Sequence, residues 1–204
     1  MRGMQEALAS QSAVQRATGT EDEAFFGEMT PKQLDEAVAP LTYLAKPGEL
    51  SAYSSDLSLL AKRRFLNEFW KRRDPTPDTP TNEVRDQFYR AISYANREFK
   101  EGGRASLPGW KSDRGRIYAK LGAPDDVLRR QQEGTAPRYE VWRFTRERNR
   151  YYIFADRTGF GAFNLIASND VHENGLANWR EILGYYALED IGDYLGMPGS
   201  FSAQ

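Results

Sequence analysis

The sequence has 204 residues, with 28 Lys and Arg, 29 Asp and Glu, one His and no Cys. Apolar residues make up 40% and aromatic residues 13%, which is enough to form a core, although the mean hydropathy of −0.71 is polar. Without cysteine there is no disulfide, thiolate zinc site, iron–sulfur cluster or cysteine nucleophile, and a single histidine excludes a multi-histidine metal site. We expect no metal and no cofactor.

Charge is unevenly distributed along the chain. The net charge is −5 over residues 1–60, +9 over residues 61–150 and −5 over residues 151–204. Such a bias concerns partners and association rather than the fold. No apolar run approaches 18 residues, and the first 30 positions lack the apolar stretch of a secretory signal, so we expect no transmembrane segment.

The N-terminal region predicts little packed structure. Residues 1–29 show poor apolar periodicity, and Thr30-Pro31-Lys32-Gln33 offers an N-cap, a proline at the first helical position and a capping box. These residues predict a short helix that runs towards Leu44 and ends at Lys46-Pro47-Gly48. We therefore interpret residues 1–50 as an extended, partly helical arm that cannot form a core alone.

Two longer helices follow. Leu59, Leu66 and Trp70 have helical spacing and predict a helix over residues 55–73, which the proline-rich segment 74–80 ends. A second helix is predicted over residues 82–101, with a regular apolar stripe and Gly102-Gly103 as its stop.

After Gly115 the pattern changes to short alternating runs rich in aromatic and branched residues. These runs predict strands at residues 117–121, 139–144, 150–155 and 161–166. The short connections between the last three are typical of hairpins, so we expect a small antiparallel sheet of about four strands within residues 116–168.

The C-terminal residues predict a loop followed by a helical tail. Apolar residues at helical spacing run from Leu176 to Leu195, with an interruption at Gly184. The predicted fold class is α+β, with the helices of residues 55–101 and the tail packed on the sheet. The predicted organisation is an arm at 1–50, an α+β domain at 51–168, and a loop and tail at 169–204.

The most distinctive motif is Gly109-Trp110-Lys111-Ser112-Asp113. It resembles the signature of the GWxTD (Gly-Trp-x-Thr-Asp) domain family of bacterial proteins, with Ser112 in place of the usual threonine. Flanking blocks are also similar to the family over residues 51–168: 69–77, 82–83, 113–118, 122–125, 139–142 and 160–161. The resemblance implies an envelope-associated or exported protein, and it implies no established activity.

The motif itself has two physical interpretations. Gly109 permits close approach, Trp110 brings a large ring, and Ser112 with Asp113 can form the turn that starts a strand at Arg116, which describes a structural corner. Alternatively, the motif contacts an anionic ligand or a partner's carboxylate. The candidate residues for this contact are Gly109, Trp110, Ser112, Asp113, Arg114 and Arg116.

An enzyme is the less favoured alternative. A carboxylate-dependent hydrolase could pair Asp113 with Asp125 or Glu140, but arginines nearby would keep these acids ionised. A serine triad would need His172, which lies in a polar stretch without a nucleophile-elbow motif. Glycine-rich nucleotide motifs do not occur in the sequence, so we assign no catalytic and no cofactor-binding residue.

The basic segment 62–73 raises a second alternative, binding of nucleic acid or anionic lipid. Its two basic triplets, residues 62–64 and 71–73, alternate with Phe65, Phe69 and Trp70. The same spacing fits a buried aromatic stripe with a solvated basic face. The acidic ends of the chain argue against nucleic acid, whereas contact with anionic lipid stays open.

The favoured hypothesis is a non-catalytic protein–protein interaction module. It would act as an accessory or scaffolding subunit of a bacterial membrane-bound multiprotein complex, and such complexes include respiratory and photosynthetic ones. The protein would be located in the periplasm, peripheral to the membrane. Its partners would be other protein subunits, because the polar arm could order on binding. The candidate partner contacts are Arg72, Arg73, Tyr185, Tyr186, Tyr194 and Phe201.

Overall fold

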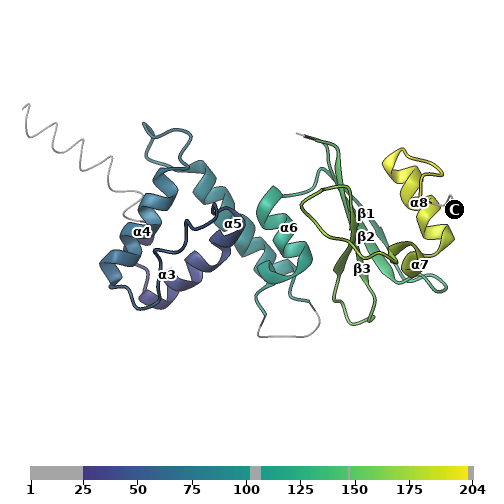
Figure 1. Cartoon of the computed structure of the whole chain (residues 1–204), viewed down its shortest axis with the longest axis horizontal. Helices are drawn as coiled ribbons and strands as arrows, with labels where there is room; N and C mark the ends of the chain where they lie inside the picture. The colour runs from purple at the N-terminus through teal and green to yellow at the C-terminus, as the bar shows by residue number, and fades with distance from the viewer. Residues whose placement is uncertain (1–24, 102–106, 147, 202–204) are drawn as a thin grey trace, which may run out of the picture. The chain divides into compact units, whose positions relative to one another are not determined.

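Figure 1 shows the computed structural model of the chain, which describes residues 25–101, 107–146 and 148–201. The chain divides into two compact units, residues 1–90 and residues 91–204. The division falls within helix α5 (Glu83–Glu98) rather than at residue 50. Most of the predicted extended segment at residues 1–29 lies outside the described residues.

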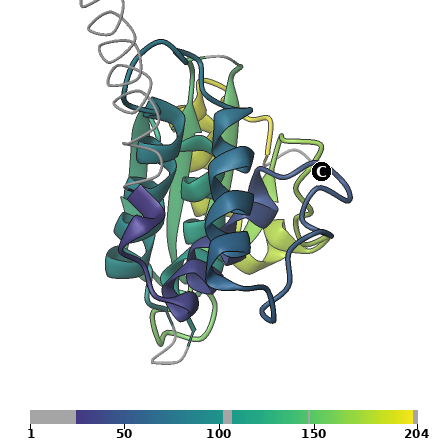
Figure 2. The same cartoon turned by 90° about the vertical axis from the view of Figure 1, so that its left-hand side faces the viewer.

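The first unit is helical, and Figure 2 shows its purple and blue helices from the side. Helix α3 (Pro31–Val38) has the predicted capping box, since the Thr30 side chain accepts from the Gln33 backbone N–H and the Gln33 side chain accepts from the Thr30 N–H. A 3₁₀ helix, η1 (Ala39–Tyr43), continues it. Helix α4 (Leu59–Lys71) begins four residues later than predicted, at a Ser58 cap.

The residues before position 50 form part of a packed core. The side chains of Phe26, Leu34 and Leu41 are completely buried, together with Phe69 and Trp70 of α4. The expectation of an extended arm is therefore wrong for residues 26–41, which are packed together with α4. Helix α3 contacts α4, and the Phe26 ring packs edge-to-face on Tyr89, so a few apolar residues are enough to bury this segment.

Helix α5 confirms the second predicted helix. Asn82 is buried and caps it: its side-chain oxygen accepts from the Arg85 backbone N–H at 3.0 Å, and its amide nitrogen donates to the Trp70 carbonyl at 2.9 Å. This residue joins the start of α5 to the end of α4 within the first unit. The helix ends at Glu98, three residues earlier than predicted.

The second unit contains the predicted four-stranded antiparallel sheet, but the first strand was misplaced. The strands are β1 (Asp126–Arg130), β2 (Arg138–Phe144), β3 (Arg150–Asp156) and β4 (Asn164–Ser168), in the order β1-β2-β3-β4. Residues 117–121 belong instead to helix α6 (Asp113–Leu121), which follows the 3₁₀ helix η2 (Gly109–Lys111). The Ser112 cap and the positive φ of 76° at Gly122 bound α6 and outweigh its alternating pattern.

Helices cover both faces of the sheet, as Figure 1 shows for α6 on one side and α7 and α8 on the other. On the first face, the Trp142 ring packs against Phe99 and Phe154. On the second face, Val141 and Ile153 join a core completed by the C-terminal helices. Because both faces are covered, β2 and β3 are buried along almost their whole length.

The C-terminal tail forms the predicted pair of helices. Helix α7 (Trp179–Leu183) and helix α8 (Tyr185–Leu195) are separated by Gly184, whose φ of 75° breaks the helix as expected. Phe201 is only 6% exposed and packs edge-to-face on Tyr151 and Trp179, so its predicted role as an exposed partner contact is wrong. In the part of the chain that the structure describes, no helix has the length and apolar character needed to cross a membrane.

Candidate functional site

The glycines of the motif let three backbone segments meet. A Cβ atom added to Gly109 would lie 2.0 Å from the carbonyl oxygen of Ala95 in α5. A Cβ atom added to Gly115 in α6 would lie 1.9 Å from the carbonyl oxygen of Gly109. Because real Cβ atoms do not approach oxygen so closely, both positions require glycine for η2 to fit between α5 and α6.

Ser112 supplies the hydrogen bonds that hold this turn. Its Oγ accepts from the Gly115 backbone N–H at 3.0 Å, as an N-cap, and donates to the Gly109 carbonyl at 2.8 Å. Trp110 is 8% exposed, and its backbone N–H donates to the Asn96 side chain at 3.3 Å. The hydroxyl that serine shares with threonine is thus used twice inside the protein.

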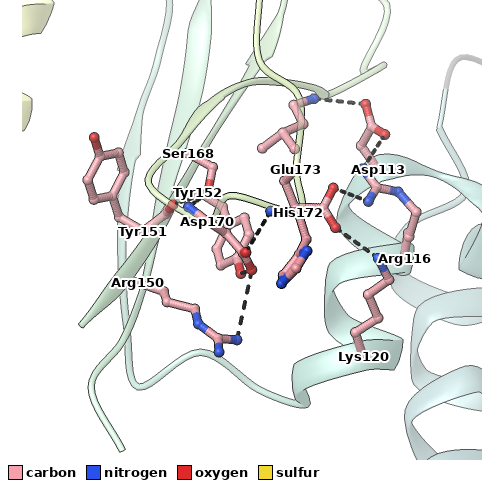
Figure 3. Close-up of polar contacts among 11 residues, drawn as sticks. Asp113, Arg116, Lys120, Arg150, Tyr151, Tyr152, Ser168, Asp170, His172 and Glu173 are labelled. Carbon is pink, nitrogen blue, oxygen red and sulfur yellow. Dashed lines mark hydrogen bonds and ion pairs between the residues drawn. The ribbon is translucent and has the colours of Figure 1, made fainter. Parts of the chain in front are cut away.

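Asp113 connects α6 to β4. Its Oδ2 accepts from the Leu165 backbone N–H at 2.8 Å, and its Oδ1 accepts from the Arg116 guanidinium at 3.1 Å. Figure 3 shows Arg116 between Asp113 and Glu173, with Lys120 reaching the same Glu173 carboxylate at 2.8 Å. These charges join helix α6 to the loop that follows β4.

Arg114 lies in a second, more buried ion-pair network. Its side chain is 12% exposed and contacts the carboxylates of Glu101 at 2.6 Å and Glu140 at 3.1 Å. The Oε2 atom of Glu101 also accepts from the Phe163 backbone N–H at 3.0 Å. Burial raises the pKa of Glu101 to about 7, against the opposing effects of Arg114 and this N–H.

Sequence reasoning missed Glu101, because a polar residue at the end of a predicted helix gives no sign that the fold will bury it.

Together, Glu101, Asp113 and Leu176 close one edge of the sheet. The two carboxylates accept from backbone N–H groups at residues 163 and 165, and the Leu176 N–H donates to the Ile166 carbonyl at 2.8 Å. The outer edge of β4 is therefore occupied by the protein's own groups.

Among the motif residues, Asp113 does not form an ion pair with both Arg114 and Arg116. Asp113 is paired with Arg116, while Arg114 pairs with Glu101 and Glu140. Each arginine of the motif already contacts two carboxylates, so an anionic ligand would have to displace at least one of them.

The acids considered for hydrolysis are separately engaged. Asp125 accepts from the Thr145 backbone N–H and pairs with Arg146, which lower its pKa to about 2. Glu140 accepts from the Trp142 indole N–H at 2.9 Å and lines a hollow of about 230 Å³. Neither Asp113 nor Asp125 lines that hollow, so the proposed pairs share no pocket there.

His172 lies on an exposed loop beside Asp170 (Figure 3). Its backbone N–H donates to the Asp170 carboxylate at 3.0 Å, and the same carboxylate accepts from the Tyr152 hydroxyl at 2.6 Å. Ser168 donates to the Tyr151 carbonyl at 2.8 Å rather than towards the histidine. These contacts order the loop and do not form a serine–histidine relay.

The basic helix is largely neutralised within the first unit. Lys62 is 2% exposed and pairs with Asp35 at 2.7 Å, and Arg63 donates to the Met29 carbonyl at 3.3 Å. Arg72 and Arg73 both pair with Glu49, and the Arg73 guanidinium lies 3.6 Å from the centre of the Phe69 ring.

These pairs have two consequences. The hydrogen bonds from Arg73 hold the pKa of Glu49 at about 2. Of the six basic residues of segment 62–73, four have an internal contact: Lys62, Arg63, Arg72 and Arg73. Arg73 is thus a structural residue, whereas Arg72 keeps about half of its side chain exposed.

A groove in the second unit lies at the start of α8. It has a volume of about 660 Å³ and is lined by residues 130–131, 133–136, 139, 183–187 and 190, and we call it the α8 groove. Tyr185 and Tyr186 line it with 56% and 85% of their surface exposed. Tyr194, one of the predicted contacts, is half-buried and does not line the groove.

Comparison with known protein families gives one match. The model of the GWxTD domain matches residues 9–174, which is most of the chain. The match extends beyond the 51–168 range of the motif blocks, and this agrees with the packing of residues 26–41 into the first unit. No curated protein and no solved structure matches the chain.

Proposed function

The chain belongs to the GWxTD domain family, and we propose that it is a non-catalytic interaction module that docks onto a protein partner through the α8 groove. The observation that carries this proposal is the exposure of two adjacent tyrosines at the rim of the groove. Tyrosine is enriched among the residues that dominate interface energies, and large apolar surface on a folded protein is typical of binding sites.

The motif supports the proposal by having its polar groups engaged inside the fold. Ser112, Asp113 and Arg114 each bond to other parts of the second unit, so the motif serves to build the unit that presents the groove. A hydrolase is less well supported, because neither Asp113 nor Asp125 lines the hollow that Glu140 lines. Nucleic-acid binding is less well supported because most basic residues of segment 62–73 are internally paired.

We further propose that the partner is another subunit of a bacterial envelope complex. The protein would then act as an accessory or scaffolding subunit on the periplasmic side of a membrane, without crossing it. Family membership supports this location, because the motif resembles that of envelope-associated proteins.

Affinity isolation of the tagged protein from native membranes tests the proposal. The wild-type protein should co-purify with a defined set of subunits, and Tyr186→Ser should lose them while remaining folded by circular dichroism. Phe160→Ser is the matched control, because Phe160 is also an exposed aromatic residue, at 82%, but lies outside the groove. Equal recovery with Tyr186→Ser and wild type would contradict the proposal.

A further inference from the structure

We infer that the segment bound by the α8 groove is cationic: a peptide stretch of the protein partner that carries Lys or Arg side chains among small apolar residues. This inference rests on the proposed function and specifies the chemistry of the partner at that site. It follows from the charges around the groove, from the exposed tyrosine rings and from the shape of the lining.

The charges at this groove differ from those elsewhere in the second unit. Acids of the motif network, such as Glu101, Glu140 and Glu173, each contact an arginine. By contrast, within the described residues no Lys or Arg side chain lies within 4.0 Å of Glu133 in the groove or Glu189 beside it.

The one arginine of the groove is already neutralised. Arg130 pairs with Asp190 at 2.7 Å, and Asp190 also accepts from the Tyr139 hydroxyl at 2.7 Å. Asp193 adds an exposed acid one turn beyond Glu189, again without a basic side chain at salt-bridge distance among the described residues. The lining of the α8 groove therefore carries two acids, Glu133 and Asp190, against one base, Arg130, and this net negative charge attracts a cation and disfavours nucleic acid or anionic lipid.

The exposed side of α8 combines this charge with aromatic rings. Tyr185 and Glu189 are one turn apart and joined by a hydrogen bond of 2.5 Å from the tyrosine hydroxyl to the carboxylate. Tyr186 extends outward beside them with 85% of its surface exposed. A cationic side chain on the Tyr186 ring would gain a cation–π contact while its charge faces the nearby carboxylates.

Cation–π contacts between arginine and aromatic rings already occur inside the protein in and around α7 and α8. The Arg180 guanidinium lies 4.8 Å from the centre of the Trp179 ring, and the Arg143 guanidinium lies 5.4 Å from the centre of the Tyr194 ring. The floor of the groove is made by small or apolar residues, among them Ala136, Leu183 and Ala187. Small apolar residues between the basic ones would fit this floor.

Two synthetic peptides test the inference without the native partner. One alternates Lys and Ala over ten residues, and the other alternates Glu and Ala. The full-length protein is titrated with each while the ring resonances of Tyr185 and Tyr186 are followed by nuclear magnetic resonance. We expect the lysine peptide to shift these resonances and to bind about tenfold more weakly to Glu133→Lys/Glu189→Lys.

The control Asp78→Lys/Glu36→Lys makes the same charge change at exposed positions of the first unit and should leave binding unchanged. Equal shifts with both peptides, or no shift with the lysine peptide at millimolar concentration, would overturn the inference. If Tyr186→Ser loses the native partner but the lysine peptide does not bind, the proposed function stands and the cationic partner is rejected. If the lysine peptide binds while co-purification is insensitive to Tyr186→Ser, the proposed function fails instead.

Discussion

Gly109 and Ser112 contribute to the motif in different ways, one through the absence of a side chain and the other through a hydroxyl. Gly109 lets η2 lie directly against the Ala95 carbonyl, and Ser112 bonds both ends of the same turn. The motif therefore acts through backbone packing and capping, and its contribution can be measured as stability.

Replacing Gly109 by alanine should destabilise the protein by about 3 kcal/mol, because the added Cβ would meet the Ala95 carbonyl oxygen at 2.0 Å. The measurement is urea unfolding followed by circular dichroism. Gly27→Ala is the control, since a Cβ there would have no atom within 4 Å. An equal stability for the two variants would show that η2 can move away from α5 without cost.

Ser112→Ala should lower the unfolding free energy by about 1–2 kcal/mol, since the cap of α6 and the bond to the Gly109 carbonyl are both lost. Ser112→Thr should change it by less than about 0.5 kcal/mol, because threonine keeps the hydroxyl. Thermal unfolding of the two variants side by side makes the comparison. A loss of similar size for threonine would mean that the buried site rejects the additional methyl group.

Glu101 should make stability depend on pH near neutrality. Its folded-state pKa of about 7 lies above the ordinary value of 4.5, so the folded chain binds this proton more tightly than the unfolded chain. The contribution of Glu101 to stability should therefore fall as the pH rises from about 4.5 to 7.

Urea unfolding of wild type and Glu101→Gln at pH 5 and pH 8 measures this effect. The advantage of wild type over the variant should shrink by about 2 kcal/mol from pH 5 to pH 8. An advantage that is constant or grows with pH would show that the Arg114 contact outweighs burial.

The sequence predicted the residues whose role is local and missed those whose role depends on tertiary burial. The hydroxyl of Ser112 was correctly expected to form a turn or cap, because capping involves neighbours a few residues apart. Phe201 was predicted to contact a partner, yet it is buried and packs on Tyr151 and Trp179. Those two rings lie 50 and 22 residues earlier in the chain, beyond the reach of local pattern analysis.

At the level of elements, α6 shows where a periodicity argument fails. Ile117, Ala119 and Leu121 alternate as in a strand, but they lie in the helix between Ser112 and Gly122, which buries Ile117 and Ala119. The helices α3, α4 and α5 were predicted well because caps and prolines mark their ends. Strand β1 was missed, since its short sequence Asp-Val-Leu-Arg-Arg is mostly charged.

The ion pair between Arg73, just after α4, and Glu49, in the loop before α4, can be tested by its effect on stability. Arg73 lowers the pKa of Glu49 to about 2, so this ion pair stabilises the folded state above pH 4.5 and its contribution is lost as the pH falls towards 2. Glu49→Gln should be less stable than wild type by on the order of 1 kcal/mol at pH 7. The difference should vanish near pH 2 in urea unfolding; a difference that persists there would assign it to packing rather than charge.

For the whole molecule, the structure shows which charges of the three sequence segments are paired within the protein. Much of the positive charge of the middle segment is used in internal ion pairs, as for Lys62, Arg73 and Arg114. Two acids of the C-terminal segment, Glu189 and Asp193, have no basic side chain at salt-bridge distance among the described residues and lie on α8 with the exposed Tyr185 and Tyr186. The proposed partner surface therefore lies in the acidic C-terminal segment rather than in the basic middle segment.

The central claim is that a partner covers the α8 groove, and chemical modification of its tyrosines measures this directly. The complex isolated from native membranes and the protein released from it are each treated with tetranitromethane, and nitration is quantified at every tyrosine by mass spectrometry. Tyr185 and Tyr186, which are 56% and 85% exposed in the chain alone, should be modified in the released protein and protected in the complex. Equal nitration of both tyrosines in the two samples would contradict the claim.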